Sequence, residues 1–361
     1  MKILVIHATA GAGHKKAAEA IYNGLLRHST HQVRIVDSLD YTNPFFKKSY
    51  PAAYVFLVTK TPMLWGFFFW FVGLSFLLPL VRLIRRCYHA INAGALERYL
   101  KEEKFDVIIT THFMSAEVSA YLKRSGQIQS KIICTVTDFD VHPIWINQGI
   151  DIYTGASDFT KKRIMSFGLS ADKVFVTGIP TDEKFAVNVE KPQIRKQLKI
   201  QTEPFTVLLA TGSFGIGPLE ELIEVLKGYQ LLVVCGHNRQ LFEKLSPKAN
   251  EKVHIFGLVN NMHELMSAAD VMVTKPGGLS IAEALVKRLP MIFFSAIPGQ
   301  ETGNINVLKV YQVASDQGTI IEIVNTLDDL STHPATYEAL RQKLDVLSKP
   351  NAVKDIISLI V

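Results

Sequence analysis

The sequence KILVIHATAGAGHKKAAEAI, residues 2–21, decides the fold. Its apolar run Lys2–His7 predicts a buried strand, the turn Thr9–His14 carries two glycines, and the stretch Lys15–Leu26 predicts an amphipathic helix. A strand, a glycine turn and a helix in this order are typical of a parallel α/β domain. The strand stands where a secretory signal would lie, so we expect the mature chain to start at residue 1.

Short runs of Val, Ile and Leu continue this alternation in two series. The clearest strands of the first series are Val33–Asp37, Val107–Thr111, Ile132–Thr137 and Val174–Thr177. A polar stretch, Asp182–Pro204, then predicts a linker with a short helix. The strands of the second series are Thr206–Ala210, Leu231–Cys235, Val253–Phe256, Val271–Thr274 and Met291–Ser295, and two more helices end the chain.

This organisation predicts two Rossmann-like α/β domains with parallel sheets. We expect an N-terminal domain over residues 1–187, a linker over 188–204 and a C-terminal domain over 205–340. Residues 341–361 would form C-terminal helices that pack back on the N-terminal domain. The carboxyl ends of both sheets would face a central cleft, because open α/β sheets bind their ligands there.

Composition excludes several classes of protein. The chain has 361 residues, with 39 basic and 33 acidic side chains and a net charge of +6. This balance is too even to indicate a nucleic-acid partner. With 48% hydrophobic residues the chain is not disordered. The three cysteines lie far apart, which excludes a disulfide framework and favours a reducing compartment.

One segment, Met63–Val81, departs from the α/β pattern. It carries no charge, with Lys60 before it and Arg82, Arg85 and Arg86 after it. By length it could span a bilayer, but strands of one sheet lie before and after it, and a sheet cannot be divided across a membrane. We therefore expect a helix or helical hairpin that lies in the membrane interface.

This interpretation predicts a peripheral, monotopic protein on the cytoplasmic face of a membrane, attached through a segment of about residues 45–95. The aromatic residues expected at or below headgroup level are Trp65, Phe68, Trp70 and Phe71. The arginines would contact an anionic membrane surface. The alternative is a fully buried core helix, for which the segment is unusually rich in Trp and Phe.

The first glycine turn places a histidine at a helix start. Gly11 and Gly13 allow the backbone to approach a ligand closely, and the helix start offers free N–H groups. The turn lacks the third glycine of a dinucleotide-binding fingerprint. The helix dipole would keep His14 neutral, so that it can act as a general base. The alternative is that His14 only caps the helix.

The second series contains two more glycine-rich helix starts, Thr211–Gly217 and Lys275–Ser280. Two such turns suit a diphosphate. Glu283 lies one turn into the following helix, where its carboxylate could accept ribose hydroxyls. Gln300 and Glu301, in a polar loop after a strand, could bind the hydroxyls of a sugar.

Several motifs together resemble a known family. They are GAGHKKAAEAI, TDFDVHPIW (Thr137–Trp145), TGIP (Thr177–Pro180), and TKPGGLSIAEAL followed by PGQETGN. From residue 3 to about residue 350 the chain is similar to the inverting GT-B glycosyltransferases, which include plastid monogalactosyldiacylglycerol synthases and bacterial diacylglycerol glucosyltransferases. More distantly it resembles the lipid-II-forming N-acetylglucosaminyltransferase. The resemblance implies a C-terminal domain that binds a nucleotide sugar and an N-terminal domain that binds a lipid acceptor.

The resemblance also implies residue roles. His14 would act in catalysis beside the acceptor hydroxyl, and Gln300 and Glu301 would contact the donor sugar. The implied UDP-binding residues are Gly212, Ser213, Phe214, Gly215, Phe256, Gly257, Val259, Pro276, Gly277, Gly278, Ser280 and Glu283. The run PGGLS is closer to the bacterial glucosyl branch than to the plastid synthases.

Further candidates for the acceptor side are Gly11, Gly13, His112, Asp138 and His142. Asp138-Phe139-Asp140 spells D-x-D, the manganese motif of a different glycosyltransferase fold. Helix N-termini already supply positive charge for the leaving diphosphate, so we expect neither a metal nor another cofactor.

These observations predict a glycosyltransferase that moves glucose or galactose from a UDP-hexose to diacylglycerol with inversion, and no nucleic-acid partner. One alternative is a transferase that acts on a polyprenyl-diphosphate-linked sugar, because it would share the donor motifs. Others are an isomerase like the UDP-sugar 2-epimerases and a lipid-surface sensor that binds UDP-sugar without turnover.

Overall fold

The structure is a computed structural model that describes residues 1–9, 11–212, 215, 217–316 and 318–360, without the side chains of residues 75 and 87–90. It divides into two compact units. The first comprises Met1–Glu183, Ile297–Gly303 and Asn351–Val361, and the second Lys184–Ala296 and Asn304–Pro350. Residues 341–350 therefore belong with the second unit and only the last eleven with the first. The first unit also includes the segment around Gln300.

A six-stranded parallel sheet forms the first unit, in the order β2-β1-β3-β4-β5-β6. Its strands are β1 (Lys2–His7), β2 (Gln32–Asp37), β3 (Val107–Thr110), β4 (Lys131–Thr135), β5 (Ile152–Gly155) and β6 (Val174–Val176). Ile3 pairs with Val33 on one side and with Val107 on the other. Strand order reverses between β1 and β3, and this switch point is where open α/β sheets bind ligands.

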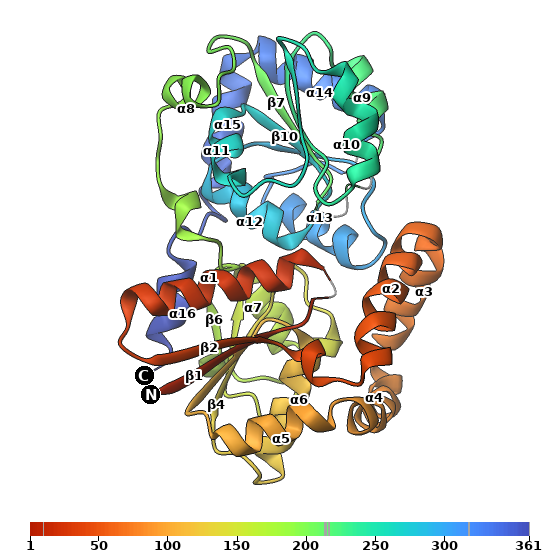
Figure 1. The fold of residues 1–361 in the computed structure, drawn as a ribbon, viewed down its shortest axis with the longest axis vertical. Helices are drawn as coiled ribbons and strands as arrows, with labels where there is room; N and C mark the ends of the chain where they lie inside the picture. Colours follow the sequence, from red (N-terminus) through yellow and green to blue (C-terminus); the bar gives the residue numbers. More distant parts are fainter. Residues whose placement is uncertain (10, 213–214, 216, 317, 361) are drawn as a thin grey trace. The chain divides into compact units, whose positions relative to one another are not determined.

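Helices cover both faces of this sheet (Figure 1). They are α1 (Ala12–His28), α5 (Gly94–Glu103), α6 (Phe113–Arg124), α7 (Asp158–Met165) and α16 (Ala352–Ser358). Helix α16 lies against α1, where Gly24 leaves room for Val353. Ile356 therefore joins Ile3 in one core cluster, although 353 positions separate them in the chain.

Three further helices lie beside this sheet: α2 (Pro44–Lys60), α3 (Pro62–Val72) and α4 (Leu78–Asn92). The apolar segment 63–81 is thus not one helix, because the chain leaves α3 at Gly73 and starts α4 five residues later. Among the described residues, no single helix is long and apolar enough to cross a membrane. The pair α2 and α3, bent by 114°, meets the length and composition criteria together.

The second unit has a five-stranded parallel sheet in the order β11-β10-β7-β8-β9. Its strands are β7 (Thr206–Ala210), β8 (Gln230–Val234), β9 (Val253–Phe256), β10 (Val271–Thr274) and β11 (Met291–Phe293). Its helices are α8 (Lys191–Gln197), α9 (Leu219–Val225), α10 (Arg239–Leu245), α11 (Met262–Ala268), α12 (Gly278–Val286), α14 (Ile320–Thr332) and α15 (Pro334–Leu344). Here the strand order reverses between β7 and β10.

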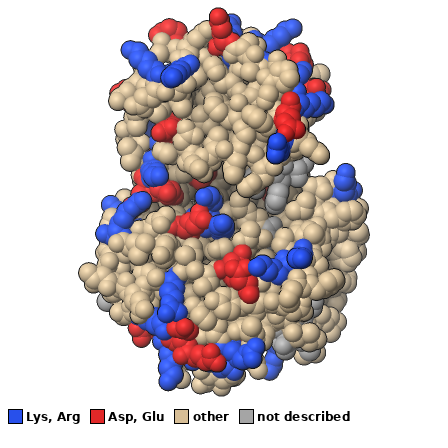
Figure 2. All heavy atoms as spheres, viewed as in Figure 1, with Lys and Arg blue, Asp and Glu red and all other residues tan. Residues whose placement is uncertain are grey.

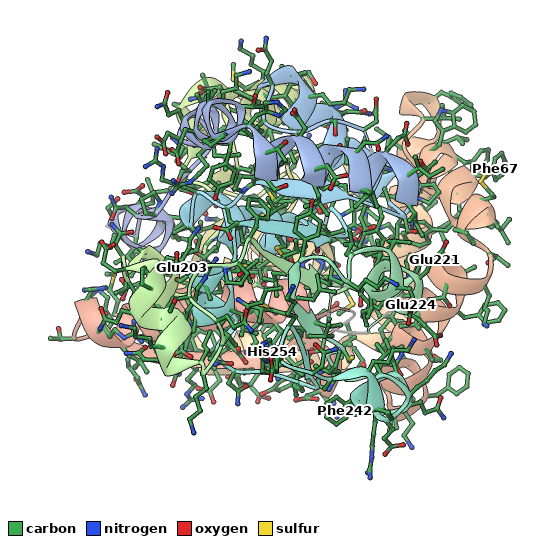
Figure 3. All side chains as sticks on the ribbon, turned by 90° about the horizontal axis from the view of Figure 1, so that it is seen from above. Phe67, Glu203, Glu221, Glu224, Phe242 and His254 are labelled. Atoms are coloured by element: carbon green, nitrogen blue, oxygen red, sulfur yellow. The ribbon has the colours of Figure 1, made fainter. Side chains whose placement is uncertain are left out.

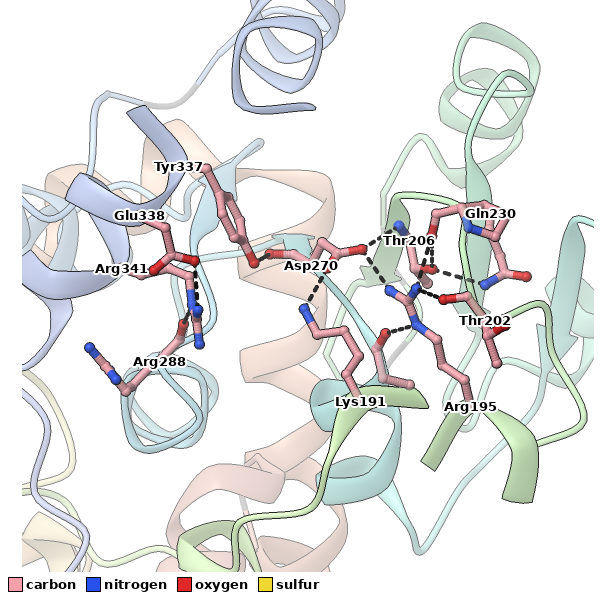
Figure 4. A network of polar contacts seen from close by, with 12 residues as sticks. Lys191, Arg195, Thr202, Thr206, Gln230, Asp270, Arg288, Tyr337, Glu338 and Arg341 are labelled. Atoms are coloured by element: carbon pink, nitrogen blue, oxygen red, sulfur yellow. Dashed lines mark hydrogen bonds and ion pairs between the residues drawn. The ribbon is translucent and has the colours of Figure 1, made fainter. Parts of the chain in front are cut away.

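A buried polar cluster fixes the expected linker to the second unit (Figure 4). Arg195 of α8 is 3% exposed and donates to the carboxylate of Asp270 over 2.7 Å and to the carbonyl oxygen of Ala268 over 2.8 Å. The same carboxylate accepts from the backbone N–H of Thr206 at the start of β7. Because each buried charge has its partners, α8 is part of this unit.

Several element bounds differ from the sequence prediction. Helix α1 begins at Ala12, so Gly13 and His14 lie in its first turn and not in a loop. Gln300 and Glu301 likewise lie in the first turn of helix α13 (Gln300–Val310). Strand β5 was not predicted, and three helices, not two, follow α13. The short 3-10 helices are η1 (Ser38–Tyr41), η2 (Ser75–Leu77), η3 (Pro143–Trp145), η4 (Ala171–Lys173), η5 (Glu183–Ala186) and η6 (Ser246–Lys248).

Candidate active site

His14 lies at the switch point of the first sheet. It stands in the first turn of α1, directly after β1, while Thr111 and His112 follow the neighbouring strand β3. Its Nδ1 lies 2.8 Å from the carbonyl oxygen of Thr111 and 2.9 Å from the hydroxyl of Thr137, which follows β4. The imidazole and its two hydrogen-bond partners therefore follow the carboxyl ends of three parallel strands, β1, β3 and β4.

The contact with Thr111 determines the tautomer of the ring. A carbonyl oxygen only accepts hydrogen bonds, so Nδ1 of His14 carries the proton and donates it. The lone pair is then on Nε2. Burial, the largest cause, lowers the pKa of His14 to about 4, so the ring is neutral at pH 7. We predicted neutrality from the helix dipole, but burial is the main reason. A neutral imidazole with a free lone pair is a competent general base.

Aromatic rings fix the orientation of His14. The His112 ring meets it edge-on at 4.7 Å, and Trp145 lies 6.0 Å away. His112 is 1% exposed, and its Nδ1 accepts the N–H of Met114 at the start of α6. His112 thus supports His14 and caps a helix. Gly11, the N-cap of α1, has φ −165°, an extended conformation that any residue adopts, and open space where a Cβ would stand.

A second polar group of the first unit joins Asp138 to the start of α13. The Gln300 amide donates to the Asp138 carboxylate over 3.1 Å, and Asp138 is 6% exposed. One carboxylate oxygen of Glu301 accepts a hydrogen bond from the backbone N–H of Ile297 over 2.7 Å and so stabilises the turn before α13. Burial raises the pKa of Tyr54 on α2, and the charges of Glu301 and Asp138 nearby raise it further.

His142 has a different position from the one we expected. Its Nε2 lies 2.9 Å from the carbonyl oxygen of Phe69 on α3, and its Nδ1 accepts the N–H of Ile144. The two rings of His142 and Phe69 are 4.3 Å apart. Burial lowers the pKa of His142 to about 4. Both ring nitrogens therefore form hydrogen bonds to the backbone. His142 thus links α3 to the Asp138–His142 run and has no lone pair available to act as a base.

The second unit places two glycine turns side by side. One follows β7 and the other β10, and these strands are parallel neighbours at the switch point. Gly212 has φ +73° and Gly215 has φ +61°, the left-handed conformation that favours glycine. A Cβ on Gly215 would also meet the carbonyl oxygen of Cys235. Ser213 and Phe214 lie outside the described residues.

The second turn leads into α12. Gly277 is its N-cap and has open space around its Cβ position, while Gly278 and Ser280 lie in the first turn and Glu283 in the second. Free N–H groups at this start can bind an anion. Asn304, which the sequence prediction missed, is fully buried and donates to the carbonyl oxygen of Pro276 over 3.0 Å. Its position on α13 depends on tertiary packing.

The expected uracil contacts lie at the end of strand β9, which β8 separates from β7 in the sheet. Phe256 is its last residue, and Gly257 and Val259 follow it at the same edge of the sheet as the glycine turns. The Cβ position of Gly257 is 3.8 Å from the Phe242 ring, an ordinary van der Waals contact. The parallel sheet therefore brings all three predicted UDP-binding segments to its carboxyl edge.

Helix α3 exposes most of its apolar side chains. The most exposed aromatic residues are Phe67 (53%), Phe68 (47%), Trp70 (60%) and Phe71 (40%). Figure 3 shows Phe67 pointing away from the ribbon. Trp65 is different: its ring packs 5.3 Å from Tyr54, and its indole nitrogen is shielded from solvent. The prediction that Trp65 lies at headgroup level does not fit this position.

The three arginines also differ from one another. Arg85 forms a largely buried ion pair with Glu117 of α6, with side chains 14% and 12% exposed, and donates to the carbonyl oxygen of Ile144 over 3.2 Å. The expected headgroup contact of Arg85 is therefore wrong. Arg86 is exposed but donates to the Tyr121 hydroxyl over 3.2 Å, whereas Arg82 is exposed on α4.

In the described part of the chain, no group of three or more His, Cys, Asp or Glu side chains is placed to hold a metal ion. Within the D-x-D run, Asp140 accepts the N–H of Val141 and lies 3.6 Å from Arg163, while Phe139 is buried.

Comparisons with known proteins agree with this architecture. Residues 14–181 match the family Monogalactosyldiacylglycerol (MGDG) synthase, and residues 193–352 match the Glycosyltransferase family 28 C-terminal domain. A processive diacylglycerol beta-glucosyltransferase of Bacillus pumilus is 27% identical, over 100% of this chain and 94% of its own.

Two solved structures share the fold. Acinetobacter baumannii MurG has 17% identity and a TM-score of 0.62, with 100% of this chain and 99% of that one covered. The UDP-GlcNAc 2-epimerase of Neisseria meningitidis, solved with UDP-GlcNAc, has 15% identity and a TM-score of 0.61 over the same shares.

The two parallel α/β units have the GT-B fold, which confirms the predicted fold class. The matching family models define the class of protein as a glycosyltransferase. One half of the chain matches the model of the monogalactosyldiacylglycerol synthases and the other that of the glycosyltransferase family 28 C-terminal domain, and over its whole length the chain is similar to the bacterial diacylglycerol glucosyltransferases, as its motifs indicated.

Proposed function

We propose that the protein transfers glucose from UDP-glucose to the free hydroxyl of diacylglycerol with inversion at C1, and so makes a membrane glycolipid. The observation that carries the proposal is the fixed tautomer of His14, which leaves a lone pair on Nε2 at the switch point of the first sheet. The name of the relatives supports the sugar and the acceptor.

The reaction needs one proton acceptor and one stabilised leaving group. Nε2 of His14 takes the proton of the acceptor hydroxyl as its oxygen bonds to C1 of the sugar. The bond from C1 to the β-phosphate oxygen breaks, and UDP leaves with the electron pair. The start of α12 beyond Gly277 stabilises the developing charge on the diphosphate, with the backbone of the Gly212 turn beside it. Glu283 binds the ribose of UDP, and Gln300 the hexose.

The membrane-facing element is the exposed apolar side of α3. Residues 41–96 contain six basic and no acidic side chains, a charge equal to that of the whole chain. On the face drawn in Figure 2, the helices α2 and α3 show no acidic side chain. Lys48, Lys60 and Arg82 are exposed within this segment. Lys47 and Arg85 have carboxylate partners outside the segment, Asp40 and Glu117. Apolar aromatics beside the exposed basic side chains favour peripheral attachment to an anionic membrane, here proposed to be its cytoplasmic face.

The experiment is incubation of the full chain with radiolabelled UDP-glucose, or UDP-galactose, and vesicles that contain diacylglycerol, followed by lipid chromatography. Labelled glucosyldiacylglycerol is expected. Label only on an added polyprenyl-diphosphate sugar, or conversion of a UDP-sugar to its epimer, would replace the proposal by one of those activities. Turnover is expected to be unchanged in EDTA, since no step is assigned to a metal.

A further inference from the structure

The segment that carries Gln300 packs directly on helix α3. A Cβ on Gly66 of α3 would stand 2.7 Å from Cβ of Pro298, which shows how closely the two backbones approach. A Cβ on Gly299 would meet the ring of Phe69. Gly299 has φ +90°, so both space and backbone conformation require glycine there. These contacts lie within the first unit.

The other side of this segment contacts the run Asp138–His142. Gln300 donates to Asp138 over 3.1 Å, and a Cβ on Gly303 would stand 3.1 Å from Asp140. Nε2 of His142 in turn donates to the Phe69 carbonyl oxygen, and its ring lies tilted against the Phe69 ring at 4.3 Å. Phe69 therefore contacts both Gly299 and His142, and the segment 297–303 lies between α3 and the Asp138–His142 run.

The exposure of the aromatic side chains of α3 separates Phe69, which contacts this segment, from its neighbours along the helix. Phe67, Phe68, Trp70 and Phe71 are 40–60% exposed, whereas Phe69 is partly buried. One eleven-residue helix thus presents an apolar surface outward and holds the start of α13 inward.

We propose that Phe69 is a positioning residue for the donor sugar, and that through it the binding of a lipid surface to α3 is coupled to the binding of the hexose. The inference rests on the proposed function. A bilayer that takes up the outer side chains of α3 restricts the helix, and the restricted helix keeps Gly299 and Gln300 in the sugar-binding arrangement. Coupling is reciprocal, so UDP-glucose also strengthens vesicle binding. UDP alone lacks the hexose and is bound by the second unit, so its affinity does not change.

The test measures the dissociation constants of UDP-glucose and of UDP with and without vesicles of phosphatidylglycerol and phosphatidylcholine that contain no diacylglycerol. We expect vesicles to tighten UDP-glucose binding about fivefold or more, the lower end of typical allosteric coupling, and to leave UDP binding unchanged. Phe69→Leu is expected to keep vesicle binding and to lose this effect. The control Phe175→Leu, which changes an exposed aromatic side chain on β6 of the same unit, should keep both.

The outcomes separate the two proposals. An equal change for UDP and UDP-glucose, or a full vesicle effect in Phe69→Leu, would overturn the coupling even if the enzyme makes glucosyldiacylglycerol. Absence of glycolipid product in the chromatography assay overturns the proposed function instead. A rise in the KM for UDP-glucose without a change in kcat at saturation in Phe69→Leu would support positioning, whereas loss of fold would lower both UDP and UDP-glucose binding.

Discussion

The amide of Gln300 donates a hydrogen bond of 3.1 Å to the carboxylate of Asp138, which lies 162 residues earlier in the chain. A carboxylate accepts and an amide NH2 group donates, so the neighbour fixes the orientation of the Gln300 side chain. Its carbonyl oxygen then points away from Asp138 and can accept a hydroxyl of the sugar.

This geometry predicts separate effects on sugar and nucleotide. Gln300→Ala is expected to weaken the binding of UDP-glucose by about 1 kcal/mol, the contribution of one neutral hydrogen bond, and to leave the binding of UDP unchanged. Glu283→Ala should weaken both ligands by ~1.5–3 kcal/mol, because a charge-assisted bond to ribose is lost. Calorimetry with each ligand measures the difference. Equal losses of UDP affinity in the two variants would contradict these roles.

His14→Ala is expected to lower turnover by ~10²–10⁴-fold, the usual loss for a general base, with UDP binding nearly unchanged. Initial rates and calorimetry measure the two quantities. His31→Ala serves as a control, because this histidine lies outside the site and precedes β2. Turnover close to that of the wild type in His14→Ala would remove this residue from the mechanism.

The pH dependence follows from the pKa of His14, which burial lowers to about 4. Activity should stay flat from pH 8 to below 6 and fall only as pH approaches 4. In the unfolded chain the ring takes up a proton near its ordinary pKa of ~6.5. Stability is therefore lost as pH falls from 6.5 towards 4. Urea unfolding at several pH values should show a shallower loss in His14→Gln, and an activity midpoint near 6.5 would contradict the assignment.

Arg82 and Arg85 are expected to separate membrane binding from stability. Arg85→Met removes the cation beside the largely buried carboxylate of Glu117, so the free energy of unfolding should fall by about 3–5 kcal/mol. Arg82→Met changes an exposed side chain, so stability should hold while binding to anionic vesicles weakens by about 1 kcal/mol. Urea unfolding and vesicle sedimentation give the two readings. Equal destabilisation by both substitutions would argue against the buried pair.

Replacement of Phe67, Phe68, Trp70 and Phe71 by Ser is expected to abolish binding to neutral vesicles, because these side chains supply the salt-independent apolar area. Leu258→Ser and Val346→Ser, which change exposed apolar residues of the second unit, are matched controls. Vesicle flotation at low and high salt distinguishes the apolar from the electrostatic contribution. Binding that survives all four replacements would place the membrane contact elsewhere.

Much of the fold could be predicted because buried parallel strands are continuous apolar runs. Thr206–Ala210, Val253–Phe256 and Val271–Thr274 agree with the structure at both ends. Strand β5 was missed because its four residues, IYTG, include only one aliphatic side chain. A helical hairpin was one of the two predicted forms of segment 63–81, but the position of the break at Gly73 was not predicted, since a run without charges gives no sign of where one helix ends.

The site shows the same limit. A glycine turn directly after an apolar run is a local pattern, so the positions of Gly212, Gly277 and His14 at the ends of strands could be predicted from the sequence. The ion pair of Arg85 with Glu117 could not, because its partner stands 32 positions away on another helix. The assignment of Gln300 to the first unit also depends on packing that no local pattern records.

The return of α16 to the first unit affects how the chain is made. Residues 1–183 emerge from the ribosome first, but the core beside α1 lacks Ile356 until about 170 further residues have been synthesised. The apolar face around Ile21 and Leu25 is exposed throughout that interval. A nascent chain stalled before residue 351 would carry a folded second unit beside an unfinished first one, which makes this face a candidate site for chaperone binding during translation.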